Sequence, residues 1–415
     1  MKVLLVNFAD GGGGAARAAY RLHRALLAAG VESRMKVRWK LGADSAVLGP
    51  AGPLARLREG IRIGVGAALQ RLQRSTDAMV RSANLLPSGW AREIDQSDAD
   101  VVHLHWLGQD TMSIEDIGRL RKPVVWTLHD MWAFCGAEHY GDTRPAARWR
   151  EGYRASNRPP GHAGLDLDRL AWQRKRNAWR RRLFLAAPTA WLKECAASSA
   201  LLSSWPCRVI PNALDTARFA PADRAAARRA LGLPESGPVV LFGGSGSDPI
   251  KGYDLLVLAL EELARLGGPR PHCAAFGAAP RRDFASGRYP IHWLGRIEDD
   301  AQLARLYSAG DAMVVPSRLD NLPQTATEAQ ACGCPVVGFS VGGMADAVEH
   351  GATGFLAPPL EPAELARGIA WVLEQGGRDL RERARERAVR LWSPGAVVPK
   401  YLALYEQAIA ACRLP

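Results

Sequence analysis

The sequence of 415 residues lacks the long apolar runs and paired cysteines that mark several protein classes. No run of about 18 apolar residues occurs, which argues against a transmembrane helix. The opening residues MKVLLVNFADGG lack the apolar core and cleavage site of a signal peptide, and they are more typical of a buried strand. We therefore expect a cytoplasmic protein, with peripheral binding at the inner face of a membrane left open.

The seven cysteines form no CxxC pair and show no metal-ligand spacing. An odd, scattered set of this kind is typical of reduced thiols in the cytosol. The sequence thus predicts neither a disulfide framework nor a metal site.

The composition is that of a globular protein, but its charge is unevenly distributed. The chain is 47% hydrophobic and 23% charged, and its length favours two domains. Residues 1–215 carry 32 basic and 20 acidic side chains, whereas residues 216–415 carry 22 of each. The whole excess of +12 therefore lies in the first half, which we expect to meet something anionic.

Short apolar runs alternate with helical patterns, which predicts an α/β fold with parallel sheets. The expected strands are Lys2–Asn7, Ser33–Val37, Val101–His105, Pro123–Leu128 and Val209–Pro211, then Val239–Phe242, His272–Phe276, Ile291–Trp293, Ala312–Val315 and Val336–Phe339. Expected helices include Ala15–Ala29, Leu255–Leu266 and Pro362–Glu374. We predict two doubly wound halves that bind ligands at the carboxyl ends of their strands.

The segment VVPSRLDNLPQTATEAQACGCPVVGF, residues 314–339, carries the clearest chemistry. A strand should lead through a loop containing Asp320 into a helix at Thr325–Cys332, with Glu328 about one turn inside. The start of a helix favours an anion because its N–H groups are unpaired. Two acidic side chains around such a site could hold the hydroxyls of a sugar and of a ribose, with a diphosphate between them.

This segment resembles the E-x7-E region of retaining glycosyltransferase family 4, with Asp320 in place of the first Glu. Its sequence is also similar to that of the family branch named after colanic-acid biosynthesis enzymes. The resemblance implies the GT-B architecture, in which two Rossmann-like domains face a cleft. It implies an acceptor-side domain at residues 1–210, a nucleotide-sugar domain at 216–392, and a C-terminal helix at 393–415 that packs back on the first domain. The interdomain linker would be RVIPNALDTARFAP, residues 208–221.

The resemblance also implies roles on the donor side. Glu328 would hold the ribose, and Asp320, with the backbone at Asn321 and Leu322, would hold the donor sugar and its phosphate. Lys251, in the Lys-Gly motif that follows a glycine-rich loop, would stabilise the leaving diphosphate. Many family members place an arginine five residues earlier, where this chain has Gly246.

A second glycine-rich loop, Asp10-Gly-Gly-Gly-Gly-Ala-Ala-Arg17, should enter the first helix. An NAD-type interpretation is weak because no acidic residue ends the second strand. In the family this loop lies near the donor phosphates, and Gly13, Gly14 and Arg17 match its motif.

Two histidine-containing motifs, HLHW at residues 103–106 and TLHDMW at residues 127–132, should lie at the ends of neighbouring strands. By resemblance, His129 is the family's cleft histidine, which positions the transferred sugar or the acceptor hydroxyl.

The basic segment Arg169–Phe184 is the densest of its kind and also carries Trp172, Trp179 and Leu183. It could bind an anionic membrane surface or pack by its aromatic residues, and both interpretations stay open. Residues 56–81 form a second basic amphipathic candidate. Nucleic-acid binding is not favoured, because no recognised motif for it is present.

Together these observations predict a retaining hexosyltransferase of surface polysaccharide assembly. Its partners would be a nucleoside diphosphate sugar and a glycan or lipid-linked acceptor, and it would need no cofactor or metal. The donor base stays open among UDP, GDP and dTDP. An inactive glycosyltransferase-fold scaffold subunit is the alternative, and a GT-B epimerase or phosphorylase is a third possibility.

Overall fold

The computed structural model describes residues 1–77, 79–243, 248–277, 289–375 and 377–413. The chain divides into two compact units, each with its own parallel sheet. Unit 1 comprises Met1–Ala213 together with the chain from Val397 onward, and unit 2 comprises Leu214–Ala396. Two doubly wound units confirm the predicted α/β architecture. Within the described ranges, no helix is both long and apolar enough to cross a bilayer.

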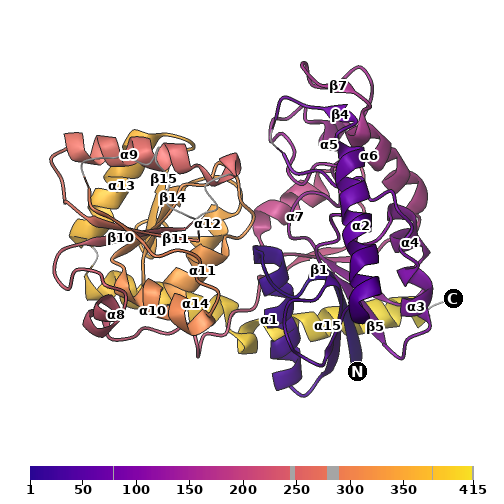
Figure 1. Cartoon of the computed structure of the whole chain (residues 1–415), viewed down its shortest axis with the longest axis horizontal. Coiled ribbons are helices and arrows are strands. Elements are labelled where there is room, and N and C mark those ends of the chain that lie inside the picture. The colour runs from indigo at the N-terminus through magenta and orange to yellow at the C-terminus, as the bar shows by residue number, and fades with distance from the viewer. Residues whose placement is uncertain (78, 244–247, 278–288, 376, 414–415) are drawn as a thin grey trace. The chain divides into compact units, whose positions relative to one another are not determined.

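Unit 1 contains a seven-stranded parallel sheet (Figure 1). From edge to edge its strands are β3 (Val47–Leu48), β2 (Glu32–Trp39), β1 (Lys2–Ala9), β5 (Val101–Leu104), β6 (Val124–Thr127), β8 (Phe184–Ala187) and β9 (Cys207–Val209). Its helices are α1 (Gly14–Ala28), α2 (Gly52–Gln70), α3 (Trp90–Asp95), α4 (Ile114–Arg119), α5 (Arg148–Glu151), α6 (Leu167–Ala178) and α7 (Ala190–Ala197). A small antiparallel pair joins β4 (Gln73–Arg74) to β7 (Ala163–Gly164).

Both faces of this sheet are buried, because alternate side chains of each strand point to opposite sides. Val3 and Leu5 of β1 pack with α1 and with α15 (Pro394–Arg413). Leu4 and Val6 pack on the other side, in a core that includes residues of α3, α4, α6 and α7. Figure 1 shows α15, in yellow, running along the sheet of unit 1.

Unit 2 contains a six-stranded parallel sheet. Its strands, in order, are β12 (Ile291–Trp293), β11 (His272–Phe276), β10 (Val239–Gly243), β13 (Ala312–Val315), β14 (Val336–Phe339) and β15 (Gly354–Ala357). Its helical elements are α8 (Arg224–Ala230), the short 3-10 helix η1 (Pro249–Lys251), α9 (Tyr253–Arg265), α10 (Asp300–Ala309), α11 (Gln324–Ala331), α12 (Met344–Ala347), α13 (Pro362–Gln375) and α14 (Arg378–Trp392). One face packs with α9 and α13, and the other with α8, α10, α11 and α14.

The C-terminal helix α15 contributes two buried tyrosines to unit 1. Its buried residues recur at helical spacing, and Tyr401 and Tyr405 are 1% and 0% exposed. The Tyr405 hydroxyl lies 2.7 Å from His103 Nδ1, and the Tyr401 hydroxyl lies 2.9 Å from Thr127 Oγ1. These bonds join the last helix to the inner strands β5 and β6.

One predicted strand of unit 1 was wrong in its bounds. The last strand is Cys207–Val209 rather than Val209–Pro211, and it pairs with β8, a strand at Phe184–Ala187 that was not predicted from the sequence. The short FLAA run of β8 lacks β-branched residues, so its pattern did not indicate a strand. The basic segment Arg169–Phe184 is helical only as far as Ala178, and Trp179 already has non-helical backbone angles.

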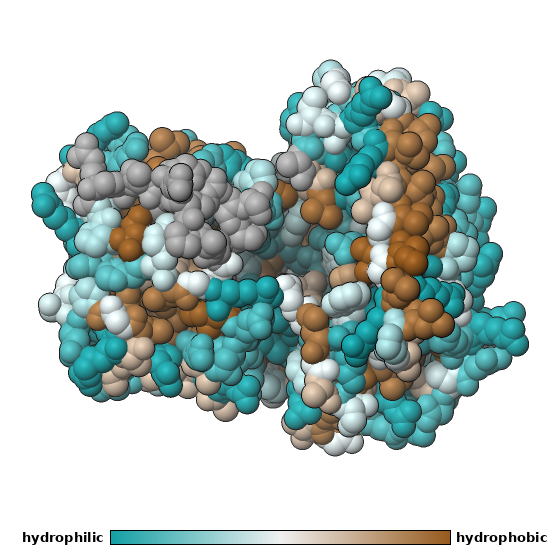
Figure 2. All heavy atoms as spheres, in the orientation of Figure 1, coloured by the Kyte–Doolittle hydropathy of each residue, from teal (hydrophilic) through white to brown (hydrophobic). Residues whose placement is uncertain are grey.

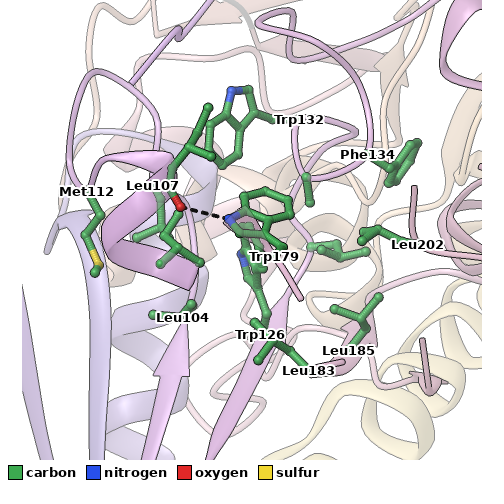
Figure 3. Close-up of a cluster of buried hydrophobic side chains, with 14 of the residues drawn as sticks. Leu104, Leu107, Met112, Trp126, Trp132, Phe134, Trp179, Leu183, Leu185 and Leu202 are labelled. Carbon is green, nitrogen blue, oxygen red and sulfur yellow. Dashed lines mark hydrogen bonds between the residues drawn. The ribbon is translucent and has the colours of Figure 1, made fainter. Parts of the chain in front are cut away.

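Trp172, Trp179 and Leu183 of that basic segment lie in the core of unit 1, where Figure 3 shows Trp179 and Leu183. Trp172, Trp179 and Leu183 are 6–7% exposed. The Trp179 ring meets Trp126 edge-on at 5.3 Å, and its Nε1 donates a 2.9 Å bond to the Ile114 carbonyl. The structure therefore favours the packed interpretation for Trp172, Trp179 and Leu183, whose side chains are not available to a membrane, whereas Leu170 of the same segment is 41% exposed.

Candidate functional site

In unit 2, Lys251 and Asp320 form an ion pair beyond the carboxyl ends of neighbouring strands. Lys251 ends the short helix η1 after β10, and Asp320 follows β13. The Lys251 Nζ lies 2.6 Å from Asp320 Oδ2. The charge of Asp320 raises the pKa of Lys251. Because 41% of the lysine side chain is exposed, its ammonium group can still reach an anion in solvent.

The lysine is placed by a glycine that no other residue could replace without strain. Gly252 has a φ of +65°, and a Cβ atom there would lie 1.9 Å from the Pro316 carbonyl oxygen. This close approach keeps η1 against the segment after β13, where Arg318 N–H also donates to the Ile250 carbonyl at 2.7 Å. The pairing of Lys251 with Asp320 follows from this contact.

A second pair of glycines supports Asp320 from the other side. The Gly343 N–H donates a 2.9 Å bond to the Asp320 carbonyl. Gly342 has a φ of +54°, and a Cβ atom there would lie 2.2 Å from the same oxygen. These glycines were not predicted as site residues, although a Gly-Gly pair after the β14 strand is the type of signal that marks a close backbone approach.

The helix that follows the loop starts without a side-chain cap. α11 begins at Gln324, its N-cap residue is Pro323, and no acidic residue stands in its first turn. Asn321 and Leu322, in the loop before it, are 3% and 6% exposed. The positive end of α11 is therefore not compensated by a capping carboxylate, as expected for an anion site.

Glu328 lies one turn further along α11 and is 1% exposed. The Tyr307 hydroxyl of α10 donates a 2.8 Å bond to Glu328 Oε2. The structure thus brings Lys251 and Asp320 together and places Glu328 in a separate buried contact. This burial of Glu328 was not predicted from the sequence, which indicated only its place inside the helix.

The Arg318 guanidinium is paired with Asp254 of α9 at 2.5 Å. Gly246, which stands where many family members have an arginine, lies outside the described residues.

In unit 1, the glycine-rich loop between β1 and α1 is anchored by Asp10. Its carboxylate accepts bonds from Leu41 N at 2.7 Å and Gly42 N at 3.0 Å. Gly13 and Gly14 are exposed, and a Cβ atom added to Gly13 would meet nothing within 4 Å. The start of α1 is therefore open to a ligand and lacks both a side-chain cap and an acidic first-turn residue.

Two other predicted residues of unit 1 lie at strand and helix ends. Arg17, in the first turn of α1, is half-buried, and its N–H bonds to the Gly13 carbonyl at 2.9 Å. His129, after β6, faces His105, after β5, with 3.0 Å between His129 Nε2 and His105 Nδ1. Burial lowers the pKa of His129 to about 4 and the pKa of His105 well below its usual value. The pair is therefore neutral near pH 7, with one ring donating to the other.

Beside this pair lies a polar cluster that was not identified from the sequence. Asp130 Oδ2 lies 2.5 Å from His139 Nδ1 and accepts a 2.7 Å bond from Trp106 Nε1. Burial would raise the pKa of Asp130, but His139 and these bonds hold it below its usual range. His105, Trp106, His129, Asp130 and His139 line one pocket of unit 1. The motifs HLHW and TLHDMW predicted part of the lining of this pocket. His139 lies outside both motifs and reaches the pocket because of the way the chain folds.

Comparisons with known proteins bear on both units. Residues 223–390 match the family described as "Glycosyl transferases group 1", and residues 12–218 match "Glycosyltransferase Family 4". The D-inositol 3-phosphate glycosyltransferase 1 of Catenulispora acidiphila is 34% identical over 367 residues, which cover 79% of this chain and 81% of that protein.

The chain spans about half the length of the first curated relatives that it matches. One is the D-inositol 3-phosphate glycosyltransferase of Acidothermus cellulolyticus, 35% identical over 232 residues that cover 50% of this chain and 49% of that protein. The matches bear on the family and not on the colanic-acid branch.

Solved structures show the same fold at low sequence identity. Sucrose-phosphate synthase from Thermosynechococcus elongatus superposes with a TM-score of 0.71 at 21% identity, covering 99% of both chains. Anabaena HepE, solved in complex with UDP-glucose, gives a TM-score of 0.60 at 17% identity over 99% of both chains. The GT-B architecture expected from the sequence is thereby confirmed.

Proposed function

Since the chain belongs to the group 1, family 4 glycosyltransferases, we propose that it moves a hexosyl unit from a nucleoside diphosphate sugar to a glycan hydroxyl with retention of configuration. The observation that carries the proposal is the Lys251–Asp320 pair, held at 2.6 Å beyond the carboxyl ends of parallel strands. Ligands of doubly wound sheets bind at such strand ends. A partly exposed ammonium there suits a diphosphate.

We propose that charge on the leaving diphosphate is stabilised by Lys251 and by the backbone at the start of α11, around Asn321 and Leu322. An uncapped helix start supplies N–H donors to an anion without cost in reorganisation. On this basis we expect the reaction to need no divalent metal. Activity that disappears with a chelator and returns with a divalent metal would contradict this expectation.

Asp320 and Glu328 would each accept hydroxyl hydrogen bonds, Asp320 from the donor sugar and Glu328 from the ribose. Asp320 is supported for this role by the glycines that fix its backbone. Glu328 is 1% exposed, so a ribose at this position would be held in a shielded site where a hydrogen bond to a carboxylate is strong.

In unit 1, Gly13, Gly14 and Arg17 would help to bind the donor phosphates, and neutral His129 would orient the transferred sugar or the acceptor hydroxyl. His129 suits orientation because its low pKa keeps it uncharged at neutral pH. We propose front-face transfer, in which the leaving phosphate accepts the proton of the attacking hydroxyl. The new glycosidic bond then forms on the same side of the sugar as the breaking bond to phosphate.

The donor proposal draws on a protein of the same fold. HepE was solved with UDP-glucose as its ligand, which makes UDP-sugars the first donors to screen, before GDP- and dTDP-sugars. We propose a glycan or lipid-linked glycan of surface polysaccharide assembly as acceptor, with the protein at the inner face of the membrane. The excess of basic residues in the first half supports an acceptor that carries phosphate or lies at an anionic surface.

The test is donor consumption by Lys251→Ala and Glu328→Ala, with Lys193→Ala and Glu194→Ala as exposed controls. We expect the first two variants to lose transfer while keeping the thermal midpoint of the wild type within a few degrees. Full activity of both would refute the site assignment. Calorimetry with UDP and GDP separates the scaffold alternative, because a scaffold with an inactive site should bind neither nucleotide.

A further inference from the structure

One face of helix α2 presents large apolar side chains to solvent. Leu54, Leu57, Ile61 and Val65 are 80%, 60%, 58% and 41% exposed, and Leu72, just beyond the helix, is 48% exposed. Spacings of three and four residues place the first four side chains on one face of the helix, and we call these four together with Leu72 the α2 stripe. In Figure 2 the stripe forms a brown band at the position that α2 occupies in Figure 1.

The helix is fixed in this orientation by polar contacts on its inner side. Arg62 donates to the backbone carbonyls of Asp110 and Pro87, at 2.8 and 2.6 Å. Glu59 pairs with Arg38 at 2.8 Å, and Gly66 is buried where a Cβ atom would lie 2.2 Å from an Asp110 oxygen. A helix on a globular core normally turns its apolar face inward. Here charged side chains face inward and leucines face outward, so the exposed stripe is a specified feature of the fold.

The surface beside the stripe is basic. Arg56, Arg58, Arg71 and Arg74 are all exposed. Between residues 52 and 74 the only acidic residue is Glu59, and its charge is paired with Arg38. An apolar face flanked by arginines combines the two contributions that hold an interfacial helix on an anionic membrane.

We propose that the α2 stripe binds the surface of an anionic lipid bilayer, with its leucines in the interfacial region and its arginines at the lipid headgroups. This proposal rests on the charge and exposure of the side chains of unit 1. Binding of the stripe would bring the protein to a membrane, where the lipid-linked acceptor of the proposed function would lie. A second copy of the chain is a poorer occupant, because two stripes face to face would bring eight exposed arginines together. A polyanion such as nucleic acid would leave the leucines without an apolar partner.

The experiment is flotation of the full chain with vesicles of phosphatidylcholine containing about 30% phosphatidylglycerol. We expect binding at about 0.05 M salt that weakens strongly at about 0.5 M, where charges are screened over a few ångströms. Leu57→Gln/Ile61→Gln should lower the partition coefficient at least about tenfold, and Arg56→Gln/Arg58→Gln by about tenfold or more, since each arginine contributes roughly a fivefold factor.

Two matched controls keep the outcomes separate. Leu258→Gln/Val389→Gln removes exposed apolar side chains elsewhere, and Arg180→Gln/Arg182→Gln removes arginines beside the packed aromatic segment. Both should bind like the wild type. Binding that is unchanged in Leu57→Gln/Ile61→Gln, or absent in the wild type at low salt, would overturn the proposal. A dimer that these two substitutions convert to a monomer without lipid would assign the stripe to a second copy and overturn it as well.

The membrane proposal and the proposed catalytic function can fail independently. UDP binding by calorimetry and donor hydrolysis, both measured without vesicles, should be equal in the wild type and in every stripe variant. Loss of flotation with intact donor hydrolysis would support the stripe. Loss of donor hydrolysis in a stripe variant would instead indicate a damaged fold.

Discussion

Gly342→Ala should strongly reduce the rate of sugar transfer and lower the free energy of unfolding only modestly. The added Cβ would lie 2.2 Å from the Asp320 carbonyl oxygen, whereas ordinary contacts begin at 3.4 Å. The Asp320 backbone must therefore move by about 1 Å, a displacement that can cost roughly 100-fold in rate when it misplaces a substrate-binding group. The left-handed φ of +54° adds about 1–2 kcal/mol of destabilisation.

Gly351→Ala provides the matched control. Gly351 also has a left-handed φ, +75°, but a Cβ atom there would meet nothing within 4 Å. Both variants should therefore lose a similar backbone contribution, seen as a fall in thermal midpoint of roughly 3–6 °C. In donor-consumption assays at 25 °C, only Gly342→Ala should show a kcat/KM reduced by about 100-fold, together with weaker UDP binding. Equal kcat/KM in the two variants would refute the inference that the Gly342 contact positions Asp320.

The histidines of unit 1 carry two further predictions. Because the folded pKa of His129 is about 4, below the usual 6.5, the unfolded chain binds more protons between these values, so stability should increase with pH across that window. His129→Asn should flatten the dependence of the thermal midpoint between pH 4.5 and 7 and abolish transfer at pH 7; an unchanged pH dependence would argue against a buried neutral ring. Tyr405→Phe removes the hydroxyl that bonds the buried His103 and should cost about 1–2 kcal/mol in urea unfolding. The half-buried Tyr20, bonded to Asp44, is the control, and an equal cost for Tyr20→Phe would contradict the special role of the buried contact.

The strands of unit 2 were predictable because buried parallel strands form continuous apolar runs. Four predicted strands, from His272–Phe276 to Val336–Phe339, coincide with β11, β12, β13 and β14. β15 was missed, since its GFLA run has only two large apolar residues. The pattern of each run sets its secondary structure locally, so no distant contact was needed to predict these four.

Charge placement was harder to predict, because it depends on contacts distant in the sequence. Lys175 lies within the basic segment and is 0% exposed, with its ammonium bonded to the backbone carbonyls of Cys135 and Gly136. Its cation also lies 3.8 Å from the centre of the Trp132 ring. A local pattern counts such a lysine as surface charge. The same limit applies to His139, whose partner Asp130 is nine residues away and depends on the intervening turn.

The candidate site was predicted in its residues and less well in its geometry. Lys251 and Asp320 are 69 residues apart, and the sequence indicated them as parts of two separate motifs, without their ion pair. Their pairing depends on Gly252 approaching Pro316, a contact that backbone conformation determines. Glu328 was identified correctly as a helix residue, but its burial beneath Tyr307 depends on how α10 packs on α11.

The tyrosines of α15 have a consequence for the order in which the protein is made. His103 and Tyr405 are 302 residues apart, and the whole of unit 2 is synthesised between them. When the first 213 residues have left the ribosome, the helix α15 that completes their core has not yet been synthesised. Unit 1 should therefore wait, with the part of one sheet face that α15 covers still exposed beside α1, while unit 2 folds first as a continuous segment. A nascent chain arrested before Val397 should be recognised by chaperones through that uncovered face.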